Sequence, residues 1–143
     1  MNLARAIEIA VEGHAGQTDK AGAPYILHPL RVMLSLETES ERIVGVLHDV
    51  VEDCPGWTFE RLRDEGFSPE VLEALAAVTK VSEDEDYPSF IARAAINPIA
   101  RAVKRADLMD NLDVRRLPIL TEKDSRRLNK YLSALAQLSK TKD

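Results

Sequence analysis

Apolar residues recur at three- and four-residue steps along most of this 143-residue chain, and no segment shows the sustained period-two alternation of a half-buried strand. Without strands the chain cannot build a nucleotide-binding fold of alternating strands and helices. We therefore expect an all-α protein. The expected helices cover about residues 3–14, 29–36, 41–53, 69–78, 88–96, 98–112 and a last helix that starts after Thr121.

Capping residues and prolines indicate where several of these helices begin and end. Ser68-Pro69 and Asn97-Pro98 each place an N-cap residue before a first-turn proline, and Pro29 is expected to open its helix in the same way. Pro55-Gly56 ends the helix that precedes it. The last helix is expected to pack on the domain through Leu128, Leu132, Leu135 and Leu138. We expect its opposite face to be solvated and basic, through Arg126, Arg127, Lys130 and Lys140.

Length and charge limit the class of protein and its partners. Residues 1–143 fit a single domain with one core. Lys and Arg total 19 against 24 Asp and Glu, so the net charge of −5 argues against non-specific nucleic-acid binding. No signal peptide or membrane span is recognisable, and Cys54 alone cannot form a disulfide within the chain. We expect a soluble, cytoplasmic protein whose oligomeric state stays open.

The segment from His48 to Asp53 is the most informative for chemistry. It reads His-Asp-Val-Val-Glu-Asp, and three acids close to a helix C-terminus oppose the negative end of the helix dipole. On a continuous helix, His48 and Glu52 share one edge, and Asp49 and Asp53 share the next. A bound cation would remove the electrostatic conflict. A solvated, charged helix end is the alternative interpretation.

Two further segments bear on that choice. His28 precedes Pro29 at an expected helix start, where it could be a cap, a buried structural histidine or a ligand. Lys104, Asp107 and Asn111 lie at i, i+3 and i+7, so they project from one helix face. Lys104 and Asp107 could simply form an ion pair. A buried carboxylate at position 107 would need some partner in either case.

Two histidines and two aspartates from three helices would form a mixed nitrogen and oxygen site with open coordination positions. Such ligands suit Mn²⁺, Fe²⁺, Co²⁺ or Zn²⁺ in a catalytic site. The metal would lower the pKa of water and neutralise phosphoryl charge. Glu52 and Asp53 would then be free carboxylates that can orient and deprotonate water.

Several of these segments together resemble a known family. Four segments occur in the order seen in the hydrolase domain of Rel/Spo alarmone enzymes: His14 to Pro29, His48 to Asp53, Val78-Thr79-Lys80, and Lys104 to Asn111. Over roughly residues 1–135 the chain resembles most closely the stand-alone small alarmone hydrolases of the HD superfamily. This resemblance implies an all-helical HD bundle that holds one Mn²⁺ between its helices and removes the 3′-pyrophosphate from ppGpp or pppGpp.

The resemblance also implies residue roles. The metal ligands would be His28, His48, Asp49 and Asp107. The catalytic pair that activates water would be Glu52 and Asp53. The substrate side would hold Lys20, Tyr25, Lys104 and Asn111. His14 matches a family position and is interpreted as structural or pocket-lining.

The chain also departs from the family pattern. Asp19 stands where the family commonly has an arginine that packs on guanine, and Leu112-Asp113-Val114 differs from the usual ribose-contacting run. An adenine alarmone such as ppApp therefore becomes a candidate substrate. The alternatives are another HD-type nucleotide phosphatase and a nucleotide-binding module without turnover. No synthetase region follows the last helix, so we expect a hydrolase only.

Overall fold

Helices account for nearly all regular structure in the computed structural model, which describes residues 2–140. Within that range the chain forms nine α-helices and one 3₁₀ helix, and the only β-type pairing is an isolated bridge between Thr18 and Pro24. The helices are α1 (Leu3–Gly13), α2 (Leu27–Leu34), α3 (Glu39–Leu47), α4 (Val50–Asp53), α5 (Phe59–Asp64), α6 (Pro69–Ala77), α7 (Tyr87–Ile96), α8 (Pro98–Asn111), η1 (Val114–Arg116) and α9 (Glu122–Lys140). The all-α prediction is confirmed.

Local capping explains where the helices begin. The side chains of Ser68 and Asn97 accept the backbone N–H groups of Val71 and Ala100, as the Ser-Pro and Asn-Pro pairs predicted. At α9, Thr121 Oγ1 accepts the backbone N–H of Asp124, and the Asp124 carboxylate accepts the backbone N–H of Thr121. Side-chain caps also start α1, α3, α5 and α7, at Asn2, Thr38, Thr58 and Asp86, whereas α2 and α4 begin without a side-chain cap hydrogen bond.

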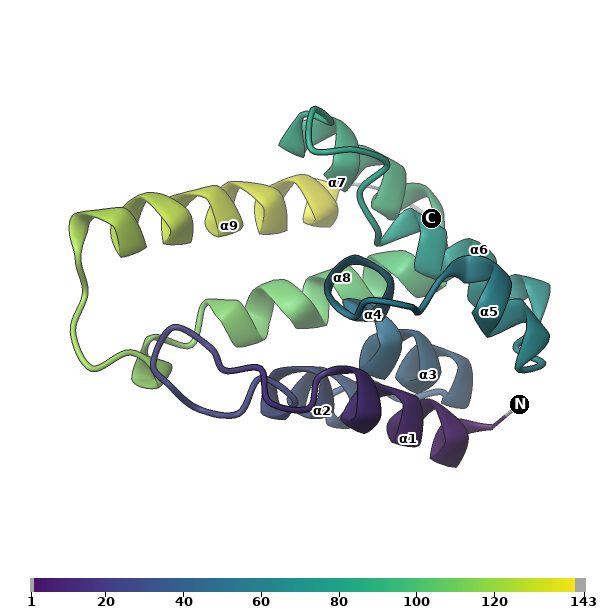
Figure 1. The fold of residues 1–143 in the computed structure, drawn as a ribbon. Coiled ribbons are helices and arrows are strands. Elements are labelled where there is room, and N and C mark those ends of the chain that lie inside the picture. Colours follow the sequence, from purple (N-terminus) through teal and green to yellow (C-terminus); the bar gives the residue numbers. More distant parts are fainter. Residues whose placement is uncertain (1, 141–143) are drawn as a thin grey trace.

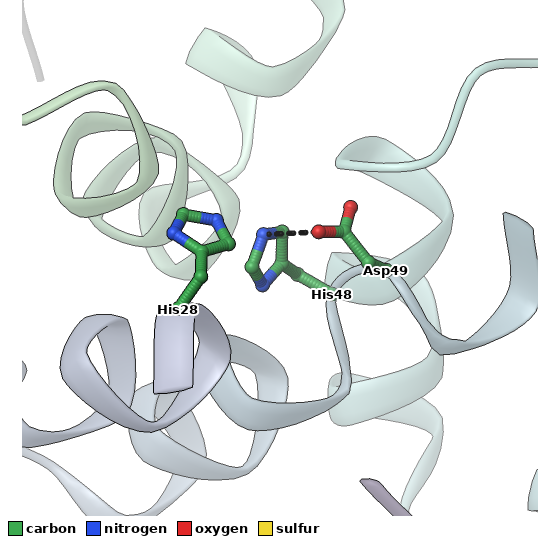
Figure 2. Close-up of side chains that lie close together, drawn as sticks. All are labelled: His28, His48 and Asp49. Atoms are coloured by element: carbon green, nitrogen blue, oxygen red, sulfur yellow. Dashed lines mark ion pairs between the residues drawn. The ribbon is translucent and has the colours of Figure 1, made fainter. Parts of the chain in front are cut away.

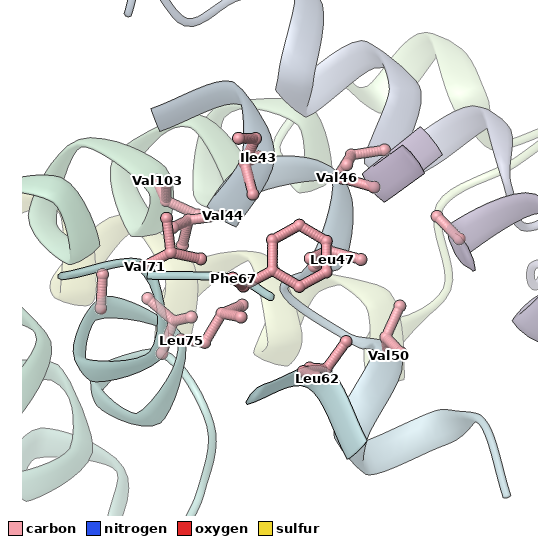
Figure 3. Packing of buried hydrophobic residues seen from close by; sticks show 14 of the residues in the cluster. Ile43, Val44, Val46, Leu47, Val50, Leu62, Phe67, Val71, Leu75 and Val103 are labelled. Carbon is pink, nitrogen blue, oxygen red and sulfur yellow. The ribbon is translucent and has the colours of Figure 1, made fainter. Parts of the chain in front are cut away.

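Helix α8 runs through the middle of the molecule. In Figure 1 it lies between the layer of α1, α2 and α3 and the pair formed by α7 and α9. The main core is aliphatic and is centred on α3, which packs against α1, α2, α6 and α8. Figure 3 shows Leu47 of α3 among side chains from neighbouring helices, and Leu47, Leu62 and Leu75 have no exposed surface. Burial of such side chains is the main source of stability here.

Helix α9 packs against α7 and α8 through a second apolar cluster. Ile91, Ala95 and Leu108 of α7 and α8 pack there against Ala134 and Leu138. Two predictions about this helix were wrong. Leu132 is 55% exposed. The face of α9 that packs on the domain consists of Tyr131, Ala134, Leu135 and Leu138 instead. Arg127 is largely covered and contacts Asp124, so it is not part of a solvated basic face.

The helix assignment differs from the prediction at α2, at the expected helix 41–53 and at α5. Helix α2 begins at Leu27, so Pro29 lies inside its first turn, where its missing N–H is not needed. The expected helix 41–53 begins earlier, at Glu39, and is interrupted after Leu47. Helix α5 was not predicted, although Thr58 caps it and Leu62 buries it. Within residues 2–140, no helix combines the length and apolar character that a membrane span requires.

Candidate metal centre

The interruption after α3 brings His48 and Asp49 together. His48 caps α3, and Asp49, with φ −106° and ψ 1°, precedes the short helix α4. On a continuous helix these adjacent side chains would diverge by about 100°. Here His48 Nε2 lies 3.1 Å from Asp49 Oδ2 (Figure 2). The tight turn therefore replaces the predicted helical edges with a local histidine–carboxylate pair.

His28 from the first turn of α2 completes a compact group with this pair. One ligand atom each from His28, His48 and Asp49 lie within 4.8 Å of one another, and both histidines are buried (Figure 2). The rings of His28 and His48 meet edge to face, with centroids 5.3 Å apart. Three of the four predicted metal ligands are thus brought to one point.

The fourth predicted ligand, Asp107 of α8, borders this group. Asp107 Oδ1 lies 2.9 Å from His28 Nε2 and 3.3 Å from His48 Nε2. Its carboxylate also accepts hydrogen bonds from Lys104 Nζ at 2.9 Å and from Asn111 Nδ2 at 3.1 Å. Lys104 and Asn111, which share one face of α8 with Asp107, therefore both contact its carboxylate. The Lys104–Asp107 ion pair considered from the sequence is present.

The ring nitrogen that carries the proton in His28 and His48 indicates whether a cation fits between the histidines and the carboxylates. His48 Nδ1 lies 2.7 Å from the Gly45 carbonyl, which can only accept, so Nδ1 carries the proton. His28 Nδ1–H likewise donates to Asp110 Oδ2 at 2.6 Å. With neutral rings, the Nε2 lone pairs would face carboxylates, Asp107 in the case of His28 and both Asp49 and Asp107 in the case of His48. Buried His48 Nε2 makes no hydrogen bond. Only a positive charge relieves this arrangement, and a divalent metal ion fits it.

The pKa values point the same way. Burial alone would lower the pKa of each histidine, but the neighbouring carboxylates outweigh it and raise the pKa of His28, and that of His48 well above its ordinary value. Burial would raise the pKa of Asp107, yet Lys104 and the histidines hold it far below its ordinary value. In the metal-free protein, protons on the imidazoles supply the charge that a metal ion would supply.

Tyr25 and His14 form the wall next to Asp49. The Tyr25 hydroxyl donates a short hydrogen bond to Asp49 Oδ2. Burial and the charge of Asp49 raise the pKa of Tyr25, so the hydroxyl stays protonated. His14 is 1% exposed and its ring centroid lies 5.0 Å from that of Tyr25. His14 therefore lies buried beside Tyr25, and its role, structural or pocket-lining, stays a prediction.

Of the two acids of α4, Glu52 lines the cleft that contains the histidines, whereas Asp53 is not among the residues that line it. Glu52 Oε1 accepts the backbone N–H of Lys80 at 2.8 Å. Asp53 is exposed, and burial together with the charges of Asp49 and Glu52 raises its pKa to about 6. Its backbone carbonyl accepts a hydrogen bond from Gln17 Nε2 at 2.9 Å. An acid with this pKa can exchange protons near neutral pH.

Two adjoining cavities surround the cluster. The cleft that contains the histidines has a volume of about 220 Å³. A larger cavity of about 370 Å³ shares Tyr25, Asn111 and Tyr131 with that cleft. Lys20 lines the larger cavity, away from the histidines. The other predicted substrate residue, Lys104, lines the cleft itself.

Asp19 has a structural role in the wall of the larger cavity. Its Oδ1 accepts the backbone N–H groups of Ala21 and Ala23, both at 2.9 Å, which shapes the loop before α2. Its Oδ2 faces the guanidinium of Arg116 at 3.6 Å. A positive group therefore enters this cavity from η1 although position 19 is acidic.

Sequence reasoning missed several residues of the site. Asp110 holds His28, and it could have been noticed because it follows Asp107 by one helical turn. Gln17 had a weaker signal, since it lies in the segment from His14 to Pro29 but contacts Asp53 only in the folded protein. Lys80 lies in the Val78-Thr79-Lys80 segment of the family resemblance, although no site role was predicted for it. Sequence reasoning also assigned no site role to five side chains that reach the cavities from distant elements: Tyr87, Arg116, Arg127, Lys130 and Tyr131.

Comparisons with known proteins agree with this fold. A solved structure of a metazoan ortholog of SpoT, described as hydrolyzing ppGpp with a role in starvation responses, has a TM-score of 0.80 at 24% identity, covering 97% of this chain and 86% of that chain. That likeness shows a shared fold.

Longer relatives share part of their sequence with this chain. A probable GTP pyrophosphokinase of Mycobacterium leprae is 34% identical over 147 aligned residues, which cover 94% of this chain and 18% of the relative. A guanosine-3′,5′-bis(diphosphate) 3′-pyrophosphohydrolase of Aquifex aeolicus is 35% identical over 121 residues, covering 77% and 17%. The chain thus spans under a fifth of the length of these relatives. The family model described as HD domain matches residues 6–118, and the chain therefore belongs to the HD domain family.

Proposed function

We propose that this protein is a metal-dependent hydrolase that removes the 3′-pyrophosphate from a purine alarmone such as ppGpp, pppGpp or ppApp. One observation carries the proposal: two buried imidazole Nε2 atoms face carboxylates, an arrangement that a bound cation would balance, and the cleft around them is lined by lysines. The names of the longer relatives and of the solved structure, which refer to ppGpp metabolism, support the choice of substrate.

The metal ligands in this proposal are His28, His48, Asp49 and Asp107. Nitrogen and oxygen donors with open positions suit Mn²⁺, which we propose as the native ion, and also Fe²⁺, Co²⁺ or Zn²⁺. When bound, the ion supplies Lewis acidity at the reacting phosphoryl group and makes water more acidic. Asp110 and the Gly45 carbonyl keep the two imidazoles in the tautomer that can bind it.

Glu52 and Asp53 act as the catalytic pair. Glu52 is oriented by the Lys80 backbone N–H, and Asp53 with a pKa of about 6 can take a proton from water. Water attacks the phosphorus next to the ribose 3′-oxygen. The bond between that phosphorus and the 3′-oxygen breaks, the 3′-oxygen gains a proton, and pyrophosphate is released.

The larger cavity receives the nucleoside in this proposal. Tyr25 and Asn111 line both cavities, so they lie where the ribose joins the 3′-diphosphate. Lys20 and Arg127 give the larger cavity its positive charge, which suits the 5′-phosphates. Lys104 pairs with Asp107 and lines the cleft, so its ammonium group would be available to a phosphate if a bound metal neutralised that carboxylate.

The two acids that departed from the family pattern do not favour a different substrate class. Both Asp19 oxygens are engaged, by backbone N–H groups and by Arg116. Asp113 forms an ion pair with Arg115. Neither carboxylate repels a phosphorylated nucleotide as a free charge would, so these two positions give no reason to prefer another phosphorylated nucleotide over an alarmone.

The proposal is tested with purified protein, Mn²⁺, and ppGpp or ppApp, with products separated by nucleotide chromatography. We expect pyrophosphate and a 3′-hydroxyl nucleotide from at least one substrate. Glu52→Gln should lose at least about 100-fold in turnover while it keeps its metal. Glu73→Gln, a change of the same kind on the remote α6 surface, should have no effect. No pyrophosphate from either substrate, with Mn²⁺, Fe²⁺, Co²⁺ or Zn²⁺, would contradict the proposal, and orthophosphate instead would favour a phosphatase.

A further inference from the structure

Three lysines from three different elements line the cleft that contains His28 and His48. Lys80 follows α6, Lys104 belongs to α8 and Lys130 belongs to α9. The elements are distant in sequence, so no local helical repeat produces this arrangement. The lysines also lie beside the acidic cluster without neutralising all of it. Their grouping therefore needs its own explanation.

The partners of these lysines differ. Lys104 is mostly buried and pairs with Asp107 at 2.9 Å. Among residues 2–140, neither Lys80 nor Lys130 has a carboxylate within ion-pair distance. Lys130 Nζ instead lies 4.1 Å from the centre of the Tyr87 ring. Burial, then the positive charges of Lys80 and Lys104, lower the pKa of Lys130, so like charges face one another here.

Tyr87 adds an unused hydrogen-bond donor to the same wall. It lines the cleft with the three lysines, and its hydroxyl is buried. In the part of the chain that the structure describes, that hydroxyl has no hydrogen-bond partner. A buried hydroxyl without a partner is costly, whereas a phosphate offers several acceptor oxygens. Ammonium groups and a tyrosine that line one cleft offer the positive charge and the hydrogen-bond donor that suit a multiply charged oxyanion.

We propose that Lys80, Lys104, Lys130 and the Tyr87 hydroxyl form a subsite for the terminal phosphate of a diphosphate group. This inference rests on the proposed function, because it assigns the inner phosphate to the histidine–aspartate cluster and the outer phosphate to the lysines. The subsite selects substrates with a 3′-diphosphate over those with a 3′-monophosphate. It also retains the pyrophosphate product, which carries the same terminal group.

The test uses inorganic pyrophosphate and orthophosphate as probes, titrated calorimetrically into the protein at a constant free Mn²⁺ concentration. We expect pyrophosphate to bind at least about tenfold more tightly than orthophosphate. Lys130→Gln should weaken pyrophosphate binding about fivefold or more with little effect on orthophosphate, and Lys130→Arg should restore most of it. Tyr87→Phe should weaken pyrophosphate binding about threefold. Lys140→Gln removes a charge from the far end of α9 and should change neither affinity.

Activity measurements separate this subsite from the proposed function. For a nucleotide with a 3′-diphosphate, Lys130→Gln should lower kcat/KM about tenfold, chiefly through KM. Lysine-dependent pyrophosphate binding without any alarmone turnover would support the subsite and contradict the proposed function. Normal turnover with equal affinity for the two probes, or with no loss of pyrophosphate binding in Lys130→Gln, would overturn the subsite and leave the function standing.

Discussion

Replacing Asp110 by asparagine should weaken metal binding although Asp110 is not among the proposed ligands. Its carboxylate accepts His28 Nδ1–H at 2.6 Å, two N–H groups of Arg31 at 2.8 and 3.2 Å, and one of Arg116 at 3.0 Å. An asparagine side chain has nearly the same shape but one acceptor oxygen and no charge. His28 therefore loses the anion that makes it a stronger base and keeps its ring in place.

The structure sets the size of the effect. Losing the partner that orients a metal-binding histidine typically lowers affinity 10- to 100-fold, or about 1.4 to 2.7 kcal/mol. Folding stability also changes. Burial would raise the pKa of Asp110, but His28 and Arg31 lower it to about 2, compared with about 3.9 in an unfolded chain. The difference corresponds to about 2–3 kcal/mol at neutral pH.

The sign of the pH dependence follows from that lowered pKa. The stability from ionised Asp110 is fully present above about pH 4 and is lost as the pH falls toward 2. In metal-free protein, the melting temperatures of wild type and Asp110→Asn should therefore differ at pH 7, begin to approach one another below about pH 4, and converge only near pH 2. The loss in metal affinity should also shrink in acid, because a less basic His28 is easier to deprotonate.

Competition with a chromophoric metal indicator measures the affinity, and thermal unfolding with a chelator measures the stability. Asp113→Asn is the matched control, since that carboxylate contacts the exposed Arg115 and no histidine. Wild-type metal affinity in a folded Asp110→Asn variant would refute the reasoning. Either Asp110 would not orient His28, or His28 would not bind the metal.

Two other predictions concern the residues around α4. Gly13→Ala would place a Cβ atom 2.8 Å from Cys54 Sγ and 3.0 Å from Cys54 Cβ. Thermal unfolding should show that the free energy of unfolding falls by about 1–2 kcal/mol, because overpacking outweighs the gain in helix propensity. An unchanged melting temperature would show that α1 and α4 separate freely. Asp53→Asn should abolish most turnover yet stabilise the metal-free protein at pH 8, because the folded-state pKa of about 6 lies above the unfolded value and ionisation opposes folding. The stabilisation should fade below pH 4, and a variant that is less stable at pH 8 would contradict the assigned pKa.

Helix positions governed by neighbouring residues were predictable from sequence. Ser68 and Asn97 cap α6 and α8 as expected, because a cap involves only groups three residues apart. The end of α3 was not predictable in this way. The apolar pattern continues through Val50, and the helix stops where His48 turns its Nδ1–H back to the Gly45 carbonyl.

The site was predictable only in part for a similar physical reason. His48 and Asp49 are neighbours in sequence, but His28 and Asp107 join them through the packing of α2, α3 and α8, which residue spacing does not encode. The family resemblance supplied that grouping. It did not supply Lys130 or Arg116, because these side chains reach the cavities from α9 and η1 through tertiary packing, which residue spacing does not encode.

The two histidines of the cluster differ in how mutation can reach them. The His48 tautomer is fixed by a main-chain atom of Gly45, which every amino acid possesses, so no side-chain replacement at that position can remove the acceptor. The His28 tautomer is fixed by the side chain of Asp110, which a single nucleotide change can alter. A side-chain change at position 110 therefore acts directly on the hydrogen bond that orients His28, whereas the hydrogen bond that orients His48 can change only through a shift of the main chain at position 45.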